Sequence, residues 1–433
     1  MTKNLWGAVC ALSFGLWANT AAASPCSGNG TAPIPAAVAG APLTLQAVLA
    51  EIRQASPAVR SAGLEIRARK AETRQAGRTT NPSLSAEMEN FAGSGAFSGY
   101  DQTETTYSLE QTFRLGGKRR YAERAANARA ALASAECAVI LHQSQLEGAV
   151  LFFELVSATE LASIAVQASD LASEFSEIVE ARVAAGAAAP PEFARARAEA
   201  VMAMALVTKA DAEVTRRQYD LVSLWGESEW PFGPPLITDD ISSAMPADTG
   251  SVTKHPDLQQ AEAATNAVRA QSRFERSNIV PDVTLSAGYR RFEETDDSAL
   301  IAGLNITLPL FDRNRDAFRA SQIRTEARAI DKTAIEARLL AELRATITEF
   351  NAATERRQML ADIAVPAAMT AYDASVRGYR VGKFDLTSTI DARRALIETR
   401  KASIEANLDQ NIAEMKLRSL TGTAPFNGEF DAQ

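Results

Sequence analysis

Hydrophobic residues along this chain recur with two different periods. In residues 43–78 they lie three or four positions apart, as at Leu45 and Leu49, and alanine, arginine, glutamate and glutamine fill the positions between them. This spacing predicts one amphipathic helix. Asn81 and Pro82 would stop it, because the residue before a proline disfavours helical geometry.

Four later segments alternate apolar and polar residues one by one, which is typical of amphipathic strands. Their apolar positions are Leu84, Ala86 and Met88, then Tyr107, Leu109 and Phe113, then Val283, Leu285, Ala287 and Tyr289, and finally Leu304, Ile306, Leu308 and Leu310. Each segment spans about ten residues, which is long enough to cross a bilayer when the strand is tilted. Small polar residues on the opposite face suit a wet interior.

Two long helical segments account for much of the remaining chain, residues 117–183 and residues 315–381. Each holds about 67 residues and would reach about 100 Å at the rise of an α-helix. Pro366 is the only proline in either segment. The first segment has apolar residues at heptad spacing, and the many alanines among them would let neighbouring helices approach closely. Gly186 and Gly382 each predict a tight turn, after which a shorter helix runs back.

The two halves of the chain repeat one another. Ser56-Pro57 recurs as His255-Pro256 and Asn81-Pro82 recurs as Val280-Pro281, both 199 positions later, whereas Gly186 and Gly382 are 196 positions apart. Two copies of one unit, each too long for a solenoid repeat, predict a pseudo-symmetric molecule that suits a duct or scaffold. The expected division is a first repeat over 43–226, a proline-rich linker over 227–250, a second repeat over 251–422 and a tail over 423–433. We expect the linker to lie outside the helical body.

The N-terminus has the composition of a secretory signal. Lys3 precedes a short apolar run, and three consecutive alanines then form a cleavage site of small residues. We expect residues 1–23 to be removed and residues 24–42 to form an N-terminal extension outside the cytoplasm. Lipidation of Cys26 is the weaker alternative, because Pro25 stands where a small residue should precede a lipidated cysteine.

The apolar runs, the cysteines and the net charge exclude further classes of protein. Beyond the signal no run of about 18 apolar residues occurs, so no transmembrane helix is expected. Cys26 and Cys137 are too few and too far apart in the sequence to indicate a disulfide framework, and packing is expected to supply the stability. A net charge of -8 argues against a nucleic-acid partner, which would require a basic face.

Few residues of the chain are candidates for chemistry. The two histidines, His142 and His255, fall in different repeats without a neighbouring cysteine, so no tight metal site is expected. No nucleophile motif, phosphate loop or metal-ligand cluster is recognisable. We therefore predict neither enzyme activity nor a cofactor.

The strand count itself predicts an assembly. Four strands cannot close a barrel, and open edges in lipid would leave backbone groups unpaired. Two chains would give eight strands and a barrel filled by side chains, whereas three chains give twelve and leave an open lumen. We favour three chains, with the long helices extending the lumen away from the membrane as a tube.

Several short motifs stand at fixed places in this pattern. They are Leu115-Gly116-Gly117-Lys118-Arg119 and Leu308-Pro309-Leu310-Phe311-Asp312-Arg313 at the two exits from strand to helix, and Gly378-Tyr379-Arg380-Val381-Gly382 at the far helical turn. Together with the repeated prolines, these motifs make residues 43–422 resemble the TolC-type outer-membrane factors of bacterial efflux systems, and most closely their CzcC-like heavy-metal branch.

The resemblance implies a fold, a location and partners. The fold would be mainly α with a membrane β-barrel, a trimeric α-helical tunnel continued by a 12-stranded barrel with four strands from each chain. The location would be the outer membrane of a Gram-negative bacterium, extending into the periplasm and contacting outer-membrane lipid. The partners would be a periplasmic adaptor and an inner-membrane pump of the RND type. Heavy-metal cations would be the cargo rather than organic compounds.

The resemblance also implies a gate where the tunnel ends in the periplasm. Tyr379 occupies the position of the gate tyrosine, Ser388 that of the first gate aspartate and Asp391 that of the second. Phe384 replaces the basic partner of the gate. A single ring of aspartates is therefore expected, in which three Asp391 carboxylates would repel one another and attract cations. The alternative is that Asp391 is an ordinary solvated residue near a helix start.

Two further groups of residues follow from the same resemblance. Residues at the helical turns would dock the adaptor, although any helical hairpin favours glycine at its turn: Val183, Gly186, Val381, Gly382 and Lys383. Aromatic residues near the strand ends would form girdles at the membrane interfaces, although some could pack against the helices instead: Phe91, Tyr107, Phe113, Tyr289, Phe292 and Phe311.

Two alternatives remain open at this stage. A periplasmic coiled-coil adaptor or scaffold, in which the strands form a small water-soluble domain, would share much of the pattern. The second hairpin loop holds Glu293, Glu294, Asp296 and Asp297, which are either simply solvated or attract metal cations at the outer mouth.

Overall fold

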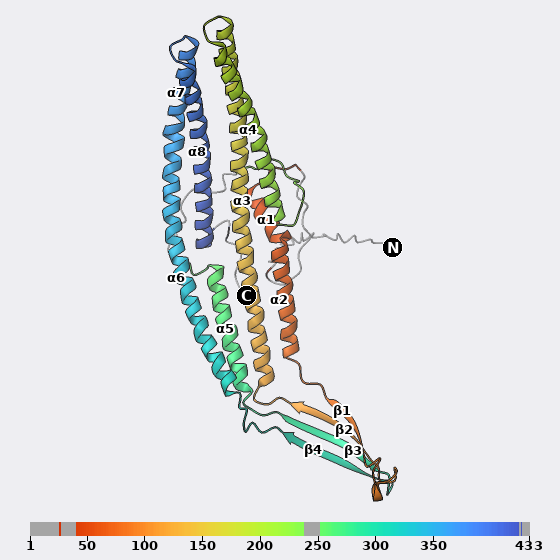
Figure 1. The fold of residues 1–433 in the computed structure, drawn as a ribbon. Coiled ribbons are helices and arrows are strands. Elements are labelled where there is room, and N and C mark those ends of the chain that lie inside the picture. The colour runs from red at the N-terminus through yellow and green to blue at the C-terminus, as the bar shows by residue number, and fades with distance from the viewer. Residues whose placement is uncertain (1–25, 27–39, 238–251, 424–425, 427–433) are drawn as a thin grey trace, which may run out of the picture.

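The computed structural model describes Cys26, residues 40–237, residues 252–423 and Phe426. The expected signal peptide, most of the N-terminal extension, part of the linker and most of the tail lie outside the described residues. Long helices run side by side along one axis, and one four-stranded sheet extends from their lower end (Figure 1).

The two halves have the same order of elements. The first half contains α1 (Leu45–Ala55), α2 (Pro57–Ala76), β1 (Ser83–Glu89), the short 3-10 helix η2 (Gly95–Phe97), β2 (Glu104–Phe113), α3 (Lys118–Ala184) and α4 (Pro190–Ser223). The second half contains α5 (Pro256–Ser277), β3 (Val283–Phe292), β4 (Asp297–Ile306), α6 (Arg315–Met359), the π-helical turn η3 (Leu360–Ala364), α7 (Val365–Arg380) and α8 (Leu386–Thr421). Each half is thus a helical segment, a strand hairpin, a long helix and a returning helix, as the sequence predicts.

The first predicted helix is divided in the structure. Ser56 separates α1 from α2 with an extended backbone, φ -52° and ψ 122°. Pro57 begins α2, and its ring excludes helical geometry at the preceding residue. The expectation of one continuous helix over residues 43–78 is wrong for this reason, and α2 also ends earlier, at Ala76.

The two long helices differ in continuity. The first, α3, is unbroken over 67 residues. The second predicted helix is divided into α6 and α7 by the π-helical turn Leu360–Ala364, directly before Pro366. Proline lacks an N–H group and its ring clashes with the carbonyl four residues earlier, so one wider turn relieves the clash while the helix continues.

One part of α3 is apolar on average, although it is not an unbroken apolar run. Among the described helices, α3 has a window apolar enough to cross a membrane, with a mean hydropathy of 1.8. Half of that window is buried inside the chain, where α3 contacts α1, α2, α4, α5 and α8. The apolar composition of α3 therefore reflects its place at the centre of the helical body.

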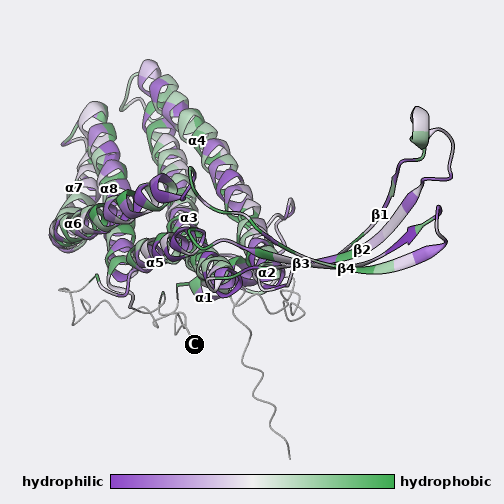
Figure 2. Ribbon diagram, turned by 90° about the horizontal axis from the view of Figure 1, so that it is seen from below, coloured by the Kyte–Doolittle hydropathy of each residue, from purple (hydrophilic) through white to green (hydrophobic). Residues whose placement is uncertain are grey.

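The four strands form one antiparallel sheet in the order β1-β2-β3-β4. The register places Leu84 opposite Leu109 and Tyr107 opposite Tyr289, so most of the apolar residues of the four strands share one face. That face is exposed in the single chain, and the sheet bends away from the helices (Figure 2). The fourth strand ends at Ile306, short of the predicted Leu310, because Pro309 cannot donate to the ladder.

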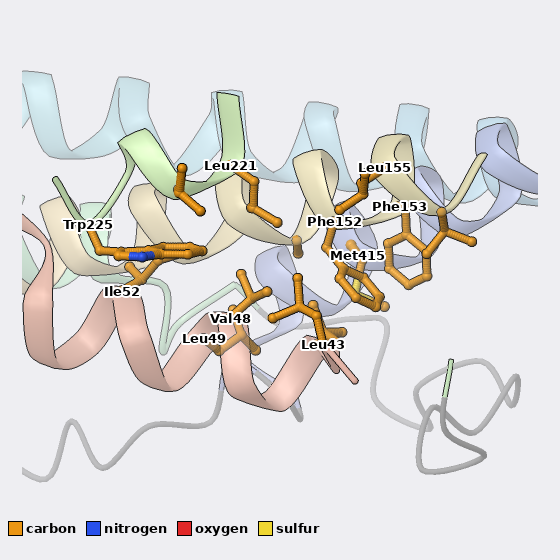
Figure 3. Packing of buried hydrophobic residues seen from close by; sticks show 14 of the residues in the cluster. Leu43, Val48, Leu49, Ile52, Phe152, Phe153, Leu155, Leu221, Trp225 and Met415 are labelled. Atoms are coloured by element: carbon orange, nitrogen blue, oxygen red, sulfur yellow. The ribbon is translucent and has the colours of Figure 1, made fainter. Parts of the chain in front are cut away.

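The largest apolar cluster lies where α1 meets α3, α4 and α8 (Figure 3). Gly148 permits the closest approach, because a Cβ atom there would lie 2.1 Å from Cδ1 of Ile52. Trp230 and Phe232 pack against the same cluster, with the ring of Phe232 6.0 Å from that of Trp225. The proline-rich linker was expected to lie outside the helical body, and its described part is instead packed onto it.

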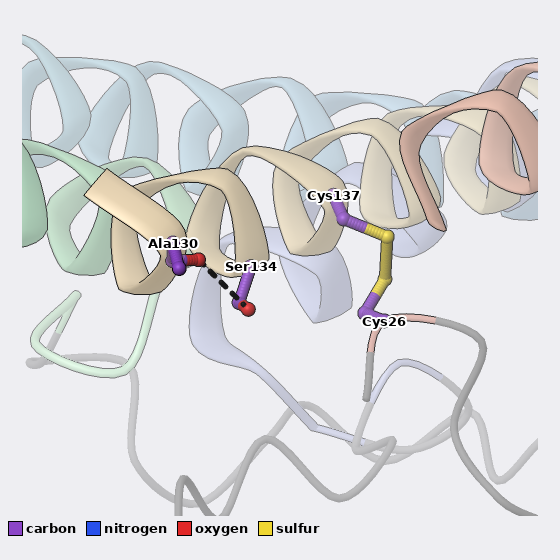
Figure 4. Close-up of a disulfide and its surroundings, with 4 residues drawn as sticks. All are labelled: Cys26, Ala130, Ser134 and Cys137. Carbon is purple, nitrogen blue, oxygen red and sulfur yellow. Dashed lines mark hydrogen bonds between the residues drawn. A yellow bond between two sulfur atoms is a disulfide. The ribbon is translucent and has the colours of Figure 1, made fainter. Parts of the chain in front are cut away.

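A disulfide bond joins Cys26 to Cys137 across 111 residues of sequence (Figure 4). The sulfur atoms lie beside Ile66 and Ala133, so the bond ties the N-terminal segment to the contact between α2 and α3. The sequence reasoning was wrong here, because separation along the chain does not limit a disulfide once helices bring the two residues together. A Cys26 sulfur held in this bond has no free thiol for a lipid.

The two histidines are also brought together, although they come from different repeats. Their ring centroids are 4.9 Å apart in a T-shaped arrangement, and both side chains are buried. Nε2 of His142 lies 3.2 Å from the carbonyl oxygen of Ser419, while Nδ1 of His255 accepts a hydrogen bond from the backbone N–H of Asp257. Burial lowers the pKa of both histidines, and the charge of His142 helps to lower that of His255 to about 4.

This pair predicts a loss of stability in mild acid. The unfolded chain binds a proton at a histidine pKa near 6.5, whereas folded His255 resists protonation until about pH 4, so stability falls as the pH drops between these values. The expected loss at His255 is about 3 kcal/mol by pH 4. Urea unfolding of the detergent-purified protein at pH 7 and pH 4 measures it.

The control for this prediction is the double variant His142→Gln and His255→Asn, in which asparagine keeps an acceptor for the start of α5. Its unfolding midpoint should fall less between the two pH values than that of the wild type. An equal fall in both proteins would assign the acid sensitivity to carboxylates elsewhere.

Candidate functional site: the helical tips and the sheet

Two helical turns meet at the end of the body farthest from the sheet (Figure 1). Gly186 ends the α3 side with φ +72°, and Gly382 ends the α7 side with φ +75°. Both values lie in the left-handed region that glycine adopts without a steric cost. In each turn a backbone N–H closes back onto the helix, from Ala187 to the carbonyl of Arg182 and from Lys383 to that of Gly378, both at 2.8 Å.

Tyr379 lies between the two hairpins rather than on the surface. Its side chain is 2% exposed and packs with Phe175, Val179 and Ile390. Its hydroxyl donates a hydrogen bond of 3.1 Å to Oε2 of Glu192, at the start of α4. Burial, together with this carboxylate, raises the pKa of Tyr379 to about 12. The predicted gate tyrosine therefore bonds across the two repeats of its own chain.

Arg182, near the end of α3, completes this contact. Its guanidinium carbon lies 4.5 Å from the centroid of the Tyr379 ring. One terminal nitrogen donates to the carbonyl oxygen of Tyr379, and the other donates to that of Ala187 at 3.0 Å. We call Arg182, Glu192 and Tyr379 the tip clamp, because the three side chains join the α3–α4 hairpin to the α7–α8 hairpin.

Sequence reasoning missed two of the three clamp residues. Arg182 has Gly378 as its counterpart in the second repeat, so the repeat pattern gives no signal for it. Glu192 also accepts from the backbone N–H of Ala189 at 3.3 Å, and a glutamate at the third helical position is a usual capping residue. The local pattern therefore explains Glu192 as a cap and says nothing about Tyr379.

Ion pairs continue the contact between the hairpins along α4 and α8. The nearly buried Arg393 donates to Oε2 of Glu199 at 3.0 Å, and Arg394 donates to the other oxygen of the same carboxylate. Arg380 pairs with Glu174 at 3.3 Å, and both of these side chains are exposed. The buried pair is the stronger restraint, because exposed pairs contribute at most about 1 kcal/mol.

Ser388 and Asp391 lie three residues apart on one exposed face of α8. Ser388 donates its backbone N–H to Oδ1 of Asp385 at 3.0 Å, so it takes part in the cap at the start of α8. Within the described part of the chain, the Asp391 carboxylate is exposed and has neither an ion pair nor a side-chain hydrogen bond. Of these two residues Asp391 is the one that carries a charge, and that charge is unpaired within the described residues.

The predicted docking residues differ in their exposure. Val381 is 69% exposed, and Gly382 and Lys383 are exposed beside it. Gly186 is exposed on the neighbouring turn, whereas Val183 is half-buried and packs against the Tyr379 cluster. The structure thus separates Val183, which supports the tip from inside, from the residues that form its surface.

The aromatic residues fall at both ends of the sheet. Tyr107 and Tyr289 are paired on the apolar face toward the loops, and Phe91 lies in the loop after β1. Phe113 ends β2 and the fully exposed Phe311 follows β4, both at the helical end. Phe292 pairs with Glu104, on the polar face, so strand alternation separates it from the other predicted girdle residues.

Known proteins resemble this chain in sequence. The sequence family described as Outer membrane efflux protein matches residues 48–227 and residues 252–423. The cobalt-zinc-cadmium resistance protein CzcC of Cupriavidus metallidurans is 28% identical over 394 residues, covering 88% of this chain and 90% of the relative. The nickel-cobalt-cadmium resistance protein NccC of Alcaligenes xylosoxydans xylosoxydans is 32% identical over 277 residues, covering 63% and 62%.

Solved structures share the fold. A crystal structure of CusC, described as undergoing transmembrane channel formation, gives a TM-score of 0.75 at 17% identity, covering 88% of this chain and 92% of CusC. The outer membrane protein VceC of Vibrio cholerae gives 0.73 at 21% identity, covering 88% and 96%. The predicted architecture of two repeats, each with a strand hairpin and long helices, is therefore confirmed as a fold shared with CusC and VceC.

Proposed function

The chain belongs to the outer membrane efflux protein family, and we propose that it works as a passive homotrimeric duct with a periplasmic adaptor and an inner-membrane pump of the RND type. As a member of this family it is an outer-membrane efflux channel. The family assignment excludes the adaptor alternative, since adaptors do not belong to this family. Families of passive channels are not enzyme families.

The exposed apolar face and the open edges of the sheet support the proposed trimer. Leu84 and Leu300 are largely exposed on its apolar face, and β1 and β4 each present an edge that has no partner strand within the described residues. In lipid, such edges leave backbone groups unpaired at several kcal/mol each, so they must pair with other chains. Three chains supply twelve strands, with the apolar face toward lipid and the serine- and threonine-rich face toward an open lumen.

The helices extend this lumen into the periplasm. Each chain contributes two hairpins, and α3 alone reaches about 100 Å at the rise of an α-helix. A continuous wet lumen cannot drive transport against a gradient, so the pump must supply the energy. The protein's own contribution is a sealed path and control over when that path is open.

We assign that control to the tips. The tip clamp of Arg182, Glu192 and Tyr379 holds the two hairpins of each chain together. Asp391, exposed on α8, would stand in a ring of three carboxylates that concentrates cations at the entrance, with Ser388 beside it as a neutral capping residue. Separating the hairpins would widen the entrance.

The surface of the tips is the proposed docking site of the adaptor. Val381, Gly382 and Lys383 form an exposed patch on one turn, and Gly186 lies on the other turn. An exposed valine at the end of a polar hairpin suits contact with an apolar residue of a partner helix. Val183 is assigned to support of the turn, because it packs inward.

Heavy-metal cations are the proposed cargo. The similar proteins CzcC and NccC are named for resistance to cobalt, zinc, cadmium and nickel. The channel itself needs no tight site for these ions, because a duct requires passage rather than affinity. Within the described residues, no group of three or more histidine, cysteine or acidic side chains is placed to hold a metal ion.

Deletion of the gene in its own host tests this function. The deletion strain should lose tolerance to cobalt, zinc or cadmium by several-fold in the minimal inhibitory concentration, and a plasmid-borne wild-type copy should restore it. Sensitivity to dyes and hydrophobic antibiotics should stay unchanged. The opposite pattern, with metal tolerance intact and dye sensitivity raised, would assign the duct to organic compounds.

A further inference from the structure

The two buried histidines lie where three separate segments of the chain meet. His142 is in the middle of α3, His255 directly precedes α5, and Ser419 lies in the last turn of α8. All three residues are at most 6% exposed. The helix α8 connects this point to the tips, whereas α5 connects it to the sheet (Figure 1). The pair therefore joins the half of the helical body near the tips to the half near the sheet.

Apolar contacts hold the end of α8 beside the pair. Phe426, a described residue of the tail, is 2% exposed, and its ring lies 5.9 Å from that of His142. Leu417 of α8 shares an apolar cluster with Leu258 of α5. These contacts involve only the ends of two helices and one tail residue. Local opening of such a small unit costs less free energy than unfolding of the whole chain.

The hydrogen bonds of the pair suit two neutral rings. Nε2 of His142 lies 3.0 Å from Oγ and 3.2 Å from the carbonyl oxygen of Ser419. Nδ1 of His255 accepts from the backbone N–H of Asp257, and this bond caps the start of α5. A proton added to that nitrogen would remove the cap, because a charged imidazole has two donors and no acceptor. A second proton on His142 would then be repelled by the first, since the ring centroids are 4.9 Å apart.

Charged groups on the neighbouring helices leave this balance in place. The Asp257 carboxylate of α5 lies 3.9 Å from Nδ1 of His255 and favours its protonation. Arg338 of α6 bonds the other oxygen of that carboxylate at 2.9 Å, and its own charge disfavours a histidinium. On α8, Arg418 is paired with Glu414 at 2.8 Å. Burial is the largest cause that disfavours a charge on His255, and it lowers the pKa of this residue to about 4.

We propose that the histidine pair is an acid-sensitive latch, which holds the end of α8 and Phe426 onto α3 and the start of α5 at neutral pH and releases them in mild acid. Released histidines take up protons in water, whereas the docked pair opposes the charge. The ratio of released to docked chains should therefore rise by up to about tenfold for each pH unit between about 6.5 and 4.

The latch also affects the helix that contributes to the tip. The upper part of α8 carries Arg393, whose pair with Glu199 joins the two hairpins. Release of the lower end of α8 removes one of the two attachments of this helix. We therefore expect the tip to open more readily when the medium outside the cytoplasm becomes acidic.

Hydrogen–deuterium exchange of the full-length protein in detergent at pH 7 and pH 5 tests the latch. Amides in residues 414–423 should lose protection by about 20-fold at pH 5, after correction for the intrinsic exchange rate. Residues 104–113 of β2, which are far from the pair, should keep their protection. Equal loss in both segments would indicate unfolding of the whole chain and overturn the latch.

Variants at the pair separate its charge from its packing. The double variant His142→Gln and His255→Asn keeps an acceptor for the start of α5 and cannot be protonated. It should lose less than about threefold of its protection between pH 7 and pH 5. Arg338→Gln should also reduce the acid effect, because Asp257 would then favour a charged His255 in the docked chain. An unchanged acid effect in the double variant would overturn the proposal.

The matched control is Phe426→Ala, which removes packing from the pair but no titrating group. It should lower the protection of residues 414–423 by a similar factor at both pH values, so the acid effect should remain about 20-fold. Loss of the acid effect in this variant would assign it to packing rather than to protonation. The exchange experiment needs no transport, so its result is independent of the proposed export function.

The effect on the tip rests on the proposed channel function and is measured separately. In a planar bilayer the wild type should open more often at pH 5 than at pH 7, whereas the double variant at the histidines should not. Absence of conductance at both pH values would contradict the channel and leave the latch supported by the exchange data. Conductance with an equal open probability at both pH values would overturn the link between the latch and the tip.

Discussion

Channels with Arg182 replaced by alanine are expected to open far more often than wild-type channels in a planar bilayer. Arg182 contributes a cation on the buried ring of Tyr379 and charged hydrogen bonds to two carbonyl oxygens at the tip. Such contacts together contribute about 2–3 kcal/mol. If they hold the two hairpins in the closed arrangement, their loss raises the ratio of open to closed channels by about 30-fold to 150-fold.

Two further variants distinguish the specific contacts of Arg182 from the effect of removing any positive charge at the tip. Arg182→Lys should give an intermediate open probability, because lysine keeps the cation but loses the planar fork of donors. Arg380→Ala removes a neighbouring cation whose pair with Glu174 also spans the two hairpins but is exposed, so it should leave gating nearly unchanged. Equal opening in Arg182→Ala and Arg380→Ala would contradict a specific clamp.

Asp391 has a different expected signature. Among the residues that the structure describes, its carboxylate makes no contact that closes the tip, so Asp391→Ala should weaken block by multivalent cations added from the periplasmic side and raise conductance. Unchanged block in this variant would leave Asp391 as a solvated surface residue.

Loss of the Cys26–Cys137 bond is expected to reduce the free energy of unfolding by up to about 5 kcal/mol, because the bond closes a long loop and restricts the unfolded chain. The described N-terminal residue and the contact of α2 with α3 would be released together, since the bond lies beside Ile66 and Ala133. Urea unfolding of the detergent-purified protein with and without a reducing agent measures this loss.

Single and double cysteine variants test whether Cys26 and Cys137 form a disulfide bond. Cys26→Ser, Cys137→Ala and the double variant should each lose about the same stability, and the reducing agent should affect none of them. Intact mass of the mature wild type should show no acyl group and two hydrogens fewer than the reduced chain. A diacylglycerol on Cys26 would contradict the disulfide and restore the lipoprotein interpretation.

The helices, strands and turns of this protein could be predicted from local sequence patterns. Alternation over about ten residues identified the strands, three- and four-residue spacing identified the helices, and Gly186 and Gly382 identified the turns. Each of these signals is read from neighbouring residues, because the side chains of one strand or one helix face sort themselves by position along the chain. The repeat added the arrangement of the two halves, and the strand count added the need for other chains.

The contacts that define the candidate sites depend on the tertiary structure. Arg182 meets Tyr379 across 197 residues and His142 meets His255 across the two repeats, while Cys26 bonds Cys137 over 111 residues. No local spacing encodes such pairs.

The sequence by itself therefore determined which segments are helix and strand, and that their apolar faces exceed what one chain can bury. Only the tertiary structure decided which side chains of distant segments meet, because that depends on how the helices are aligned along one another and on the register of the strands. A shift of one residue in a strand would send Tyr107, which pairs with Tyr289, to the other face of the sheet. The contacts between the two hairpins at the tips depend on those alignments.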